Sequence, residues 1–478
     1  ILSSDLWRRQ SLPLGVRDLP FKLPRDLTEG HKMLRLLLLS CLVSVSVAQG
    51  TCGGSVVCFY PSFRTNSLTP DRIPADLCTH IVYSYAKVIG WNATMEPSTP
   101  ADTEIYRKLL DLKKSNPALK VLVSIGGSHT DNFAFDIVTY AFTTLEIFTQ
   151  NVAKFVNKHN LDGIDVHWEF PEPKNKIGYS TLVTELRKQL GPGKIIAVSV
   201  SGNHQDIMNN YDYVNLNRDA DLILLMSFNY HGLWEQRTGI NAPLQSSSGN
   251  PYTADYSLNL WNRVGIPRGK LLLGIPAFGP EWYLKSKKNA EVGDAGTPTY
   301  LRAFSEICVQ NSSYTWRYSE EHGGTFGVRG SEWVSMDTPE MVMLKANYVK
   351  SRGFGGVVFW EIGQDDYEGV CGKERFPLVR LAQKTLCPPS SSVLPTSTTS
   401  TTQAPQSAPN TTPVSTRSSV DVKIPNCKKV GMFRHQGETQ KFFWCTRVGS
   451  PPLILTCPRG TRFNNLTLVC DHIDKVSV

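Results

Sequence analysis

The body of the chain alternates short apolar, β-branched runs with longer stretches of helical periodicity, such as TLEIFTQNVAKFVNKHN at 144–160. Strands that alternate with helices favour a parallel sheet covered by helices, and eight such runs predict a closed parallel barrel with helices outside. A doubly wound open sheet is the alternative. The runs predicted to be strands are 56–60, 79–86, 120–127, 161–169, 194–202, 220–230, 270–279 and 355–362.

The spacing between the last two predicted strands is longer than a normal helical crossover. Residues 280–354 lie in this interval. Connections inside compact domains are short, and an interval of this length therefore indicates that these residues form structure of their own. We therefore predict an inserted subdomain at about 281–350.

The beginning of the chain has the pattern of a targeting segment. Met33 opens MLRLLLLSCLVSVSVAQG, in which Arg35 precedes a short apolar run and Ala48 ends a small-residue cleavage pattern. This pattern is typical of a secretory signal peptide, so residues 33–48 are expected to be removed and 1–32 to be a non-structural leader. A buried helix is the alternative. We expect a secreted, extracellular protein.

Composition then divides the rest of the chain into two parts. Residues 388–424 consist almost wholly of Ser, Thr, Pro, Gln and Ala. Such a segment cannot bury a core and is expected to be a disordered linker. It separates a body at 49–387 from a small tail at 425–478.

Charge and cysteine content limit the classes of function. The 478 residues carry a formal net charge of +8, and no cluster of five basic residues occurs, which makes nucleic-acid binding improbable. Of 11 Cys, Cys41 lies in the signal segment, so an even number remains for an oxidising compartment. We expect no cofactor, no metal, no membrane association and a monomer. Sequons for N-glycosylation stand at Asn92, Asn311, Asn410 and Asn465.

The segment LDGIDVHWEF at 161–170 holds the strongest candidate for chemistry. Side chains alternate faces along a strand, so Asp165, His167 and Glu169 are expected to share one face. Catalytic groups of a parallel barrel lie at the carboxyl ends of its strands, where Glu169 could act as a general acid. The alternative is that these residues are a solvated acidic strand end without a chemical role.

This segment resembles the Asp-Gly-x-Asp-x-Asp-Trp-Glu signature of the family-eighteen glycoside hydrolases, the chitinases and chitinase-like lectins. Further segments resemble the same family in order along the body: LCTHIVYSYAKV, KVLVSIGG, MSFNYHGLWEQRTGINAPL, KLLLGIPAFG and GFGGVVFWEIGQDDYEGVC. The resemblance implies an α/β fold, the (β/α)₈ TIM barrel, with an α+β insertion after its seventh strand.

Enzymes of that family cleave β-1,4-linked N-acetylglucosamine polymers with retention, by a substrate-assisted mechanism outside the usual two-carboxylate scheme. The resemblance makes Glu169 the acid and Asp165 the deeper carboxylate. His167 stands where the family has the Asp that orients the acetamide and stabilises the charged intermediate. A neutral imidazole would carry no charge there, and a protonated one would repel the cation.

Other family positions also depart from the pattern. Phe228 and Asn229 replace a Tyr and an Asp that hold the acetamide, Phe278 replaces a Tyr, and Ser128 replaces a stacking Trp. Each lost polar contact costs on the order of 10²–10³ in rate. We therefore favour a chitin-binding, chitinase-like protein with little or no hydrolysis. An active endochitinase, supported by the retained Glu169, and a signalling lectin are the alternatives.

The cleft could still bind sugar without hydrolysing it, because ring stacking needs no catalytic charge. Trp360 is retained as the stacking floor, and Met226 is also retained. His231 and Trp234 are expected to pack within their own loop. The substrate-binding residues expected from the resemblance are Trp360, Met226, Phe228, Asn229 and Phe278.

The tail resembles a peritrophin-type chitin-binding module, with an aromatic run of Phe442, Phe443 and Trp444 available to stack on sugar rings. Strand alternation turns Phe443 away from the other two. A zinc knuckle is the alternative. A module this small needs disulfides because its core is slight. The resemblance implies the pairs Cys58–Cys78, Cys308–Cys371, Cys427–Cys445 and Cys457–Cys470, and the two remaining residues suggest Cys52–Cys387.

Overall fold

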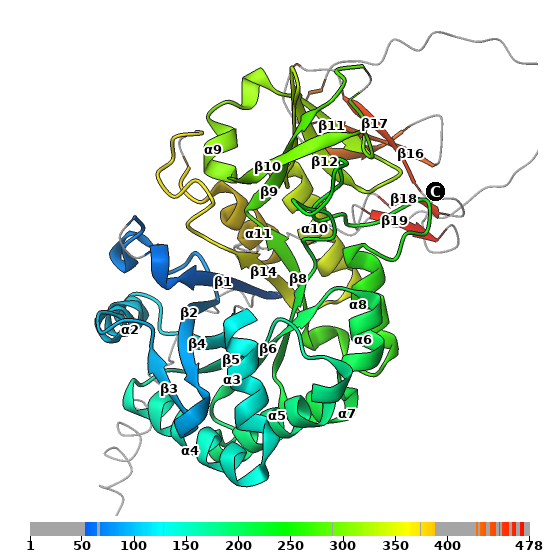
Figure 1. Ribbon diagram of the computed structural model, residues 1–478. Helices are drawn as coiled ribbons and strands as arrows, with labels where there is room; N and C mark the ends of the chain where they lie inside the picture. Colours follow the sequence, from blue (N-terminus) through cyan, green and yellow to red (C-terminus); the bar gives the residue numbers. More distant parts are fainter. Residues whose placement is uncertain are drawn as a thin grey trace, which may run out of the picture. The chain divides into compact units, whose positions relative to one another are not determined.

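The structure is a computed structural model of the chain (Figure 1). It describes residues 53–387 apart from 65–66, 128, 289 and 373, and short pieces of the tail between 427 and 472. The expected leader, signal segment and linker lie outside the described residues, as do Cys52, Ser128, Asn410 and Asn465.

Eight parallel strands form a closed barrel, and all eight strands expected from the sequence are confirmed. The order β1-β14-β8-β7-β6-β5-β4-β2 closes through the pairing of β1 with β2. A short antiparallel strand, β3 (Thr94–Pro97), extends β2 and was not expected. The barrel strands are β1 (Ser55–Pro61), β2 (His80–Ile89), β4 (Lys120–Gly126), β5 (Gly163–His167), β6 (Ile195–Ser201), β7 (Leu222–Met226), β8 (Leu271–Pro276) and β14 (Gly356–Trp360).

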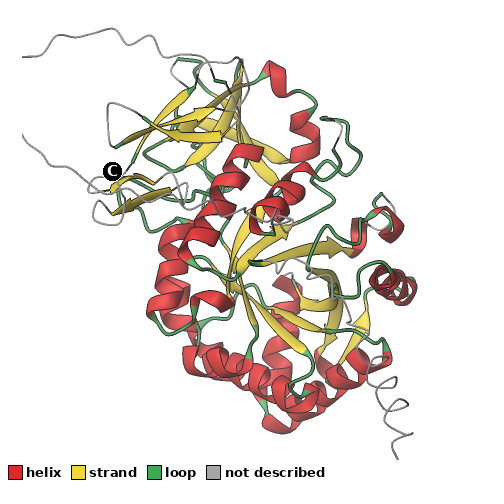
Figure 2. Ribbon diagram, turned by 180° about the vertical axis from the view of Figure 1, so that it is seen from behind, coloured by secondary structure: helices red, strands yellow, loops and turns green. Residues whose placement is uncertain are grey.

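Helices surround these strands, as the view from behind shows (Figure 2). Several begin at a polar cap, such as Thr253 before α8 and Thr338 before α10, whose hydroxyls accept backbone N–H groups of the first turn. The helices of the barrel are α2 (Asp102–Asp111), α3 (His129–Tyr140), α4 (Phe142–Lys158), α5 (Lys176–Leu190), α6 (His204–Asn210), α7 (Tyr213–Asp219), α8 (Ala254–Arg263), α10 (Pro339–Arg352) and α11 (Pro377–Leu386).

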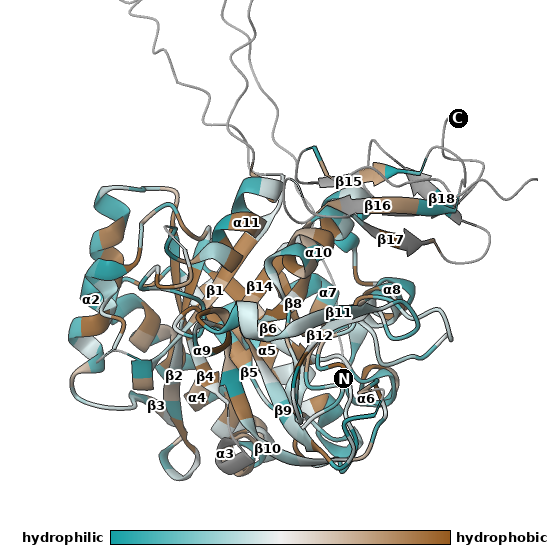
Figure 3. Cartoon of the chain, turned by 90° about the horizontal axis from the view of Figure 1, so that it is seen from above, coloured by the Kyte–Doolittle hydropathy of each residue, from teal (hydrophilic) through white to brown (hydrophobic). Residues whose placement is uncertain are grey.

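The barrel encloses one apolar layer and is surrounded by a second. Figure 3 shows hydrophobic residues along β1, β8 and β14 and on helices α10 and α11. The outer layer lies between strands and helices and forms a continuous core. Alternation of side chains along each strand supplies both layers, which is why the strands read as nearly continuous apolar runs. The inner layer consists of Val57, Phe59, Val82, Leu122, Ala197, Leu224, Leu272 and Val358.

An inserted antiparallel sheet follows β8, in the order β10-β9-β13-β12-β11. It runs from Phe278 to Ser335, so it ends earlier than the expected bound of 350, because α10 follows it and covers the barrel. Trp282, Phe326 and Trp333 form its core. Its elements are β9 (Phe278–Leu284), β10 (Gly296–Ala303), α9 (Phe304–Cys308), β11 (Thr315–Ser319), β12 (Gly324–Arg329) and β13 (Glu332–Ser335).

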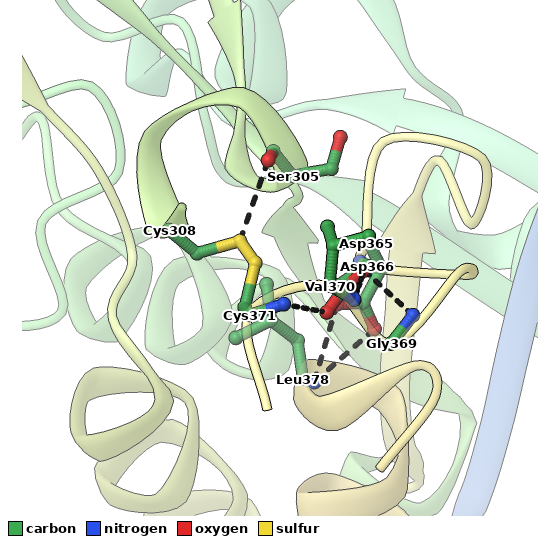
Figure 4. Close-up of a disulfide and its surroundings, with 8 residues drawn as sticks. All are labelled: Ser305, Cys308, Asp365, Asp366, Gly369, Val370, Cys371 and Leu378. Carbon is green, nitrogen blue, oxygen red and sulfur yellow. Dashed lines mark hydrogen bonds between the residues drawn. A yellow bond between two sulfur atoms is a disulfide. The ribbon is translucent and has the colours of Figure 1, made fainter. Parts of the chain in front are cut away.

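A disulfide, Cys308–Cys371, fastens α9 of the insertion to the loop that follows β14 (Figure 4). In the same loop the buried Asp366 carboxylate accepts backbone N–H groups of three residues, from Gly369 to Cys371. A second disulfide, Cys58–Cys78, joins β1 to the segment before β2. Both pairings are those expected from the sequence. Cys387 is disulfide-bonded as well.

The tail is described only in pieces, which form a three-stranded and a two-stranded antiparallel sheet. The disulfide Cys427–Cys445 is present, as expected, and Cys457 is also disulfide-bonded. Phe442 is buried, whereas the neighbouring Phe443 is half-exposed, in keeping with strand alternation. The strands are β15 (Gly431–Arg434), β16 (Lys441–Cys445), β17 (Leu453–Thr456), β18 (Thr461–Asn464) and β19 (Val469–His472).

Two expected glycosylation sites fall in the described part of the chain. Asn92 and Asn311 are both exposed, each in a short 3₁₀ turn, so both are accessible to modification. Glycosylation at these positions remains a prediction. Within the described residues, no helix combines the length and apolar character needed to cross a membrane.

A buried ion pair ties α10 to the rest of the barrel and gives a test of the fold. Lys345 is fully buried, and its ammonium donates to the Asp337 carboxylate and to the carbonyl oxygen of Ala242 at 2.7 Å. We expect Lys345→Met to lower the free energy of unfolding by about 3–5 kcal/mol, because it leaves the Asp337 carboxylate buried and unpaired. Denaturant unfolding measures this loss.

Matched variants separate the charge from the side-chain volume. Lys350→Met, on the exposed face of the same helix, should change the free energy of unfolding by less than about 0.5 kcal/mol. Adding Asp337→Leu to Lys345→Met should recover much of the loss. A stability of Lys345→Met equal to that of Lys350→Met would contradict this account.

Candidate active site

The side chains of Asp165, His167 and Glu169 form one row at the carboxyl end of β5. The first two point to the same face of the strand because they are two residues apart, and Glu169 continues the row just beyond the strand. Gly163 opens β5 where a Cβ atom would meet the carbonyl oxygen of Ile195 at 2.0 Å. The glycine thus lets β6 approach closely and fixes the depth of the row in the barrel.

Asp165 lies at the bottom of the row and is fully buried. Its carboxylate accepts the Ser124 hydroxyl from β4 at 2.6 Å and the Ser199 hydroxyl from β6 at 3.1 Å. Hydroxyl donors from both neighbouring strands compensate the carboxylate for its lost hydration.

His167 is buried between two carboxylates. Its Nε2 lies 2.7 Å from Oε1 of Glu169, and its Nδ1 lies 3.6 Å from Oδ2 of Asp165. Burial alone would lower the pKa of the imidazole, but the Asp165 and Glu169 carboxylates outweigh it and raise the pKa from 6.5 to about 9. At neutral pH His167 is therefore an imidazolium that lies between the Asp165 and Glu169 carboxyl groups.

Aromatic rings enclose this row. The Trp360 ring lies 5.6 Å from the His167 ring and 4.9 Å from Phe59, measured between centroids. Tyr85 stacks on Trp360 at 5.9 Å, and its hydroxyl lies 3.3 Å from Nε2 of His167. Trp360 itself is partly exposed, but it is not among the residues that line the pocket beside Glu169, so its expected place on the floor of the cleft stays a prediction.

Glu169 is the one member of the row that reaches solvent, with 33% of its side chain exposed. Asn132, in the first turns of α3, donates from Nδ2 to the backbone carbonyl of Glu169 at 2.6 Å. Gly126 supports the same region from β4. It adopts a φ of +102°, and a Cβ atom there would meet the carbonyl oxygen of His167 at 2.3 Å.

A pocket of about 490 Å³ opens beside Glu169. Met226, Phe228 and Asn229 line it from the end of β7, as expected. Phe278 does not line it: this ring is buried and packs edge-on against Phe228 at 5.9 Å. The remaining lining residues are Phe170, Ser201, Gly202, Asn203, Tyr230, His231, Trp234, Glu235 and Tyr252.

Asn241 holds the backbone of the lining residue Asn229 and was not predicted from the sequence. Its Oδ1 accepts the backbone N–H of Asn229 at 2.9 Å, and its Nδ2 donates to the carbonyl of Phe278 at 3.1 Å. Asn229 has a φ of 57°, a left-handed conformation that Asn tolerates better than most residues. Asn241 lies within the segment TGINAPL, but one sequence gives no sign that its amide bridges two strands.

Trp234 packs on its own loop, as expected, since a Cβ atom on Gly232 would lie 2.4 Å from its ring. Its side chain is 65% exposed and lines the pocket together with Tyr252. In the same loop Nδ1 of His231 lies 3.0 Å from a carboxylate oxygen of Glu235, and this polar contact helps to hold the loop.

One cluster outside the pocket has the residue types of a metal site: Cys308, Asp366 and Cys371. Both sulfurs form the disulfide, and the Asp366 carboxylate already accepts backbone N–H groups. Metal binding needs thiolates, so this cluster fits a structural role.

The barrel, the inserted sheet and the acidic row on β5 together match a known protein family. Residues 55–365 match the family described as Glycosyl hydrolases family 18. The chain belongs to this family. Residues 427–478 match a second description, the Chitin binding Peritrophin-A domain. The glycosyl hydrolase family 18 match includes all eight barrel strands and the insertion.

Individual relatives in this family differ in their descriptions. The chain is 31% identical over 368 residues to probable chitinase 10 of Drosophila melanogaster, covering 69% of this chain and 16% of that protein. It is 27% identical over 420 residues to an endochitinase of Manduca sexta, covering 79% and 75%. Human YKL-39, described as a pseudo-chitinase with retained chitooligosaccharide binding properties, has a TM-score of 0.66 at 27% identity, covering 70% and 99%.

The raised pKa of His167 gives a pH-dependent contribution to stability. The group is charged below a pKa of about 9 in the folded chain and near 6.5 in the unfolded chain. Its contribution is therefore fully present below pH 6.5 and is lost as the pH rises through 9, an effect of about 3 kcal/mol at 1.36 kcal/mol for each pKa unit. We expect His167→Gln to remove this loss from denaturant unfolding curves at pH 6–10.

His80 provides the matched control for this measurement. Burial lowers the pKa of His80 to about 4, so its titration affects stability on the acid side of pH 6.5. His80→Gln should leave the slope between pH 7 and 10 unchanged. The account fails if wild type and His167→Gln lose stability in parallel over that range.

Proposed function

We propose that this protein binds chitin or chitooligosaccharides outside the cell and hydrolyses them slowly or not at all. The observation that carries the proposal is the contact of 2.7 Å between Nε2 of His167 and Oε1 of Glu169. It joins the one retained acid of the site to a buried imidazolium.

This contact opposes general-acid catalysis. A proton on Nε2 is donated to Oε1, so a proton for the glycosidic oxygen could be carried only on the other carboxylate oxygen of Glu169. A cation at position 167 also repels the positive charge that develops on the sugar and its acetamide during substrate-assisted cleavage. Both effects act on the transition state and leave ground-state binding of a neutral sugar largely unaffected.

Contacts to the acetamide are also reduced. Phe228 brings no hydroxyl to the pocket, Asn229 brings no charge, and Phe278 is turned inward against Phe228. Each missing preorganised contact costs on the order of 10²–10³ in rate, and the losses do not add simply. Together with His167, a loss of about 10⁴ or more follows.

Sugar binding is supported by the groups that remain. Trp360 and Trp234 are both accessible aromatic rings on the cleft side of the barrel, and aromatic faces stack on sugar rings without needing catalytic charge. The match of the tail to a chitin-binding domain adds a second binding element on the same chain. When one of the two elements binds a polymer chain, the linker keeps the other element close to that chain and so raises the effective polymer concentration that it meets.

An active endochitinase is the second candidate. The observation that favours it is the position of Glu169. This residue lies just beyond the carboxyl end of β5, borders the pocket and is partly exposed. In this case a bound substrate would displace Nε2 of His167 from Oε1, and the acid would then be free to carry a proton.

Hydrolysis of a fluorogenic N-acetylchitooligosaccharide by the secreted chain at pH 3–9 tests the proposal. We expect the wild-type rate to lie within about tenfold of the Glu169→Gln rate, because the acid lacks its supporting groups. Restoring those groups with His167→Asp, Phe228→Tyr and Asn229→Asp together should raise the rate at least about 10²-fold.

Binding is measured on the same proteins by titration calorimetry with chitotetraose. Wild type and Glu169→Gln should bind equally, and Trp360→Ala should bind about tenfold more weakly because the stacking face is lost. Turnover in the wild type that disappears in Glu169→Gln would establish the endochitinase instead. No binding by the folded wild type would contradict both candidates.

A further inference from the structure

We propose that the outer face of α3 is a second chitin-binding surface, separate from the cleft. This surface, here called the α3 patch, consists of Phe133, Ile137 and Tyr140 on the helix and Trp91 beside it. It rests on the proposed function only in taking chitin as the ligand; its residues lie outside the pocket lining.

The α3 patch arises because α3 is apolar on two opposite faces. Phe135 and Val138 are fully buried against the barrel. Phe133, Ile137 and Tyr140 follow the i, i+4, i+7 spacing, which places them in one stripe on the other side of the helix. In that stripe Phe133 is 69% exposed and Tyr140 is 92% exposed. Exposed apolar side chains gathered on one face of a helix mark an interaction site, so the stripe points to a ligand.

Trp91 adds the largest ring to this stripe. It lies in the 3₁₀ turn Gly90–Asn92 and is 84% exposed. A Cβ atom on Gly90 would lie 3.1 Å from Ile137, so the turn packs directly on the middle of α3. The side chain of Asn151 on α4 donates to the carbonyl of Ala93 at 2.9 Å, which fixes the turn in this position.

The chemistry of the α3 patch favours a neutral polysaccharide. Three of its four members are aromatic and none is charged, and flat rings offer stacking faces to pyranose rings at little cost in conformational entropy. Phe133 and Tyr140 are separated by about 10 Å along the helix axis, which suits a ligand that is extended and repeats, as a polymer does.

The N-terminal end of α3 lies beside the candidate active site, although the α3 patch itself is separate from the pocket. Asn132, the residue before Phe133, donates to the backbone carbonyl of Glu169. The stripe therefore begins next to the acid and runs along the outside of the barrel, on the helix shown in cyan in Figure 1. A chitin fibre on this face would lie within reach of the cleft, whereas a short soluble oligomer would occupy the cleft alone.

Hydroxyl-radical footprinting of the full chain tests this assignment, read residue by residue by mass spectrometry. The protein is labelled alone, with chitotriose and with particulate chitin. We expect chitotriose to protect the cleft residues Trp234 and Trp360, and particulate chitin to protect Trp91, Phe133 and Tyr140 as well. Val214, an exposed residue of α7, should be oxidised equally in all three samples.

A variant extends the same test to affinity. Replacing both Phe133 and Tyr140 by Ser should weaken adsorption to particulate chitin roughly tenfold while leaving chitotriose affinity unchanged, because two exposed rings are lost and the cleft is not altered. Val214→Ser is the matched control. Since all three side chains are exposed, each variant should fold like the wild type.

The outcomes separate this proposal from the proposed function. Protection of Trp234 with no protection of the α3 patch overturns the patch and keeps the cleft. Protection of the patch alone supports the patch and contradicts sugar binding in the cleft. Protection of Trp91 and Tyr140 without chitin, lost on dilution or on enzymatic removal of N-glycans, would assign the patch to a second copy or to a glycan at Asn92 and overturn the proposal.

Discussion

A cation between two carboxylates is the interaction on which the whole site depends. Strand alternation in a closed barrel forces residue 167 to point inward between Asp165 and Glu169, where water cannot solvate a charge. The ring hydrogen-bonds to Glu169 through Nε2 and lies 3.6 Å from Asp165 through Nδ1, and the hydroxyls of Ser124 and Ser199 donate to Asp165 from the neighbouring strands. The same arrangement that stabilises this buried row removes the negative charge that a substrate-assisted hydrolase needs at its centre.

Much of the architecture could be predicted from local sequence. The eight barrel strands are apolar runs that are buried on both faces, and a run of this kind can be recognised as a strand without knowing its neighbours. The place of Glu169 followed from period-two alternation alone. The inserted sheet was located by the length of an interval, but its end at Ser335 was not, because nothing in the sequence of α10 shows whether this helix covers the barrel or the insertion.

The features that could not be predicted depend on distances between strands. The charge of His167 depends on two neighbouring carboxylates and on burial. From the sequence alone, both a neutral and a protonated ring were possible. Trp234 packs on Gly232 of its own loop, as expected, but its side chain is also 65% exposed and lines the pocket, which the sequence did not predict. The bridge made by Asn241 and the outward stripe on α3 likewise become visible only when neighbouring elements are in place.

The protonation state of His167 is the central claim, and nitrogen-15 NMR of the imidazole measures it most directly. With His167→Gln to assign the signal among the ten histidines, the spectrum at pH 7 should show two protonated ring nitrogens that titrate near pH 9. Addition of chitotriose should leave the ring charged, because binding does not require its proton. A neutral ring at pH 7, with one protonated and one bare nitrogen, would contradict the account.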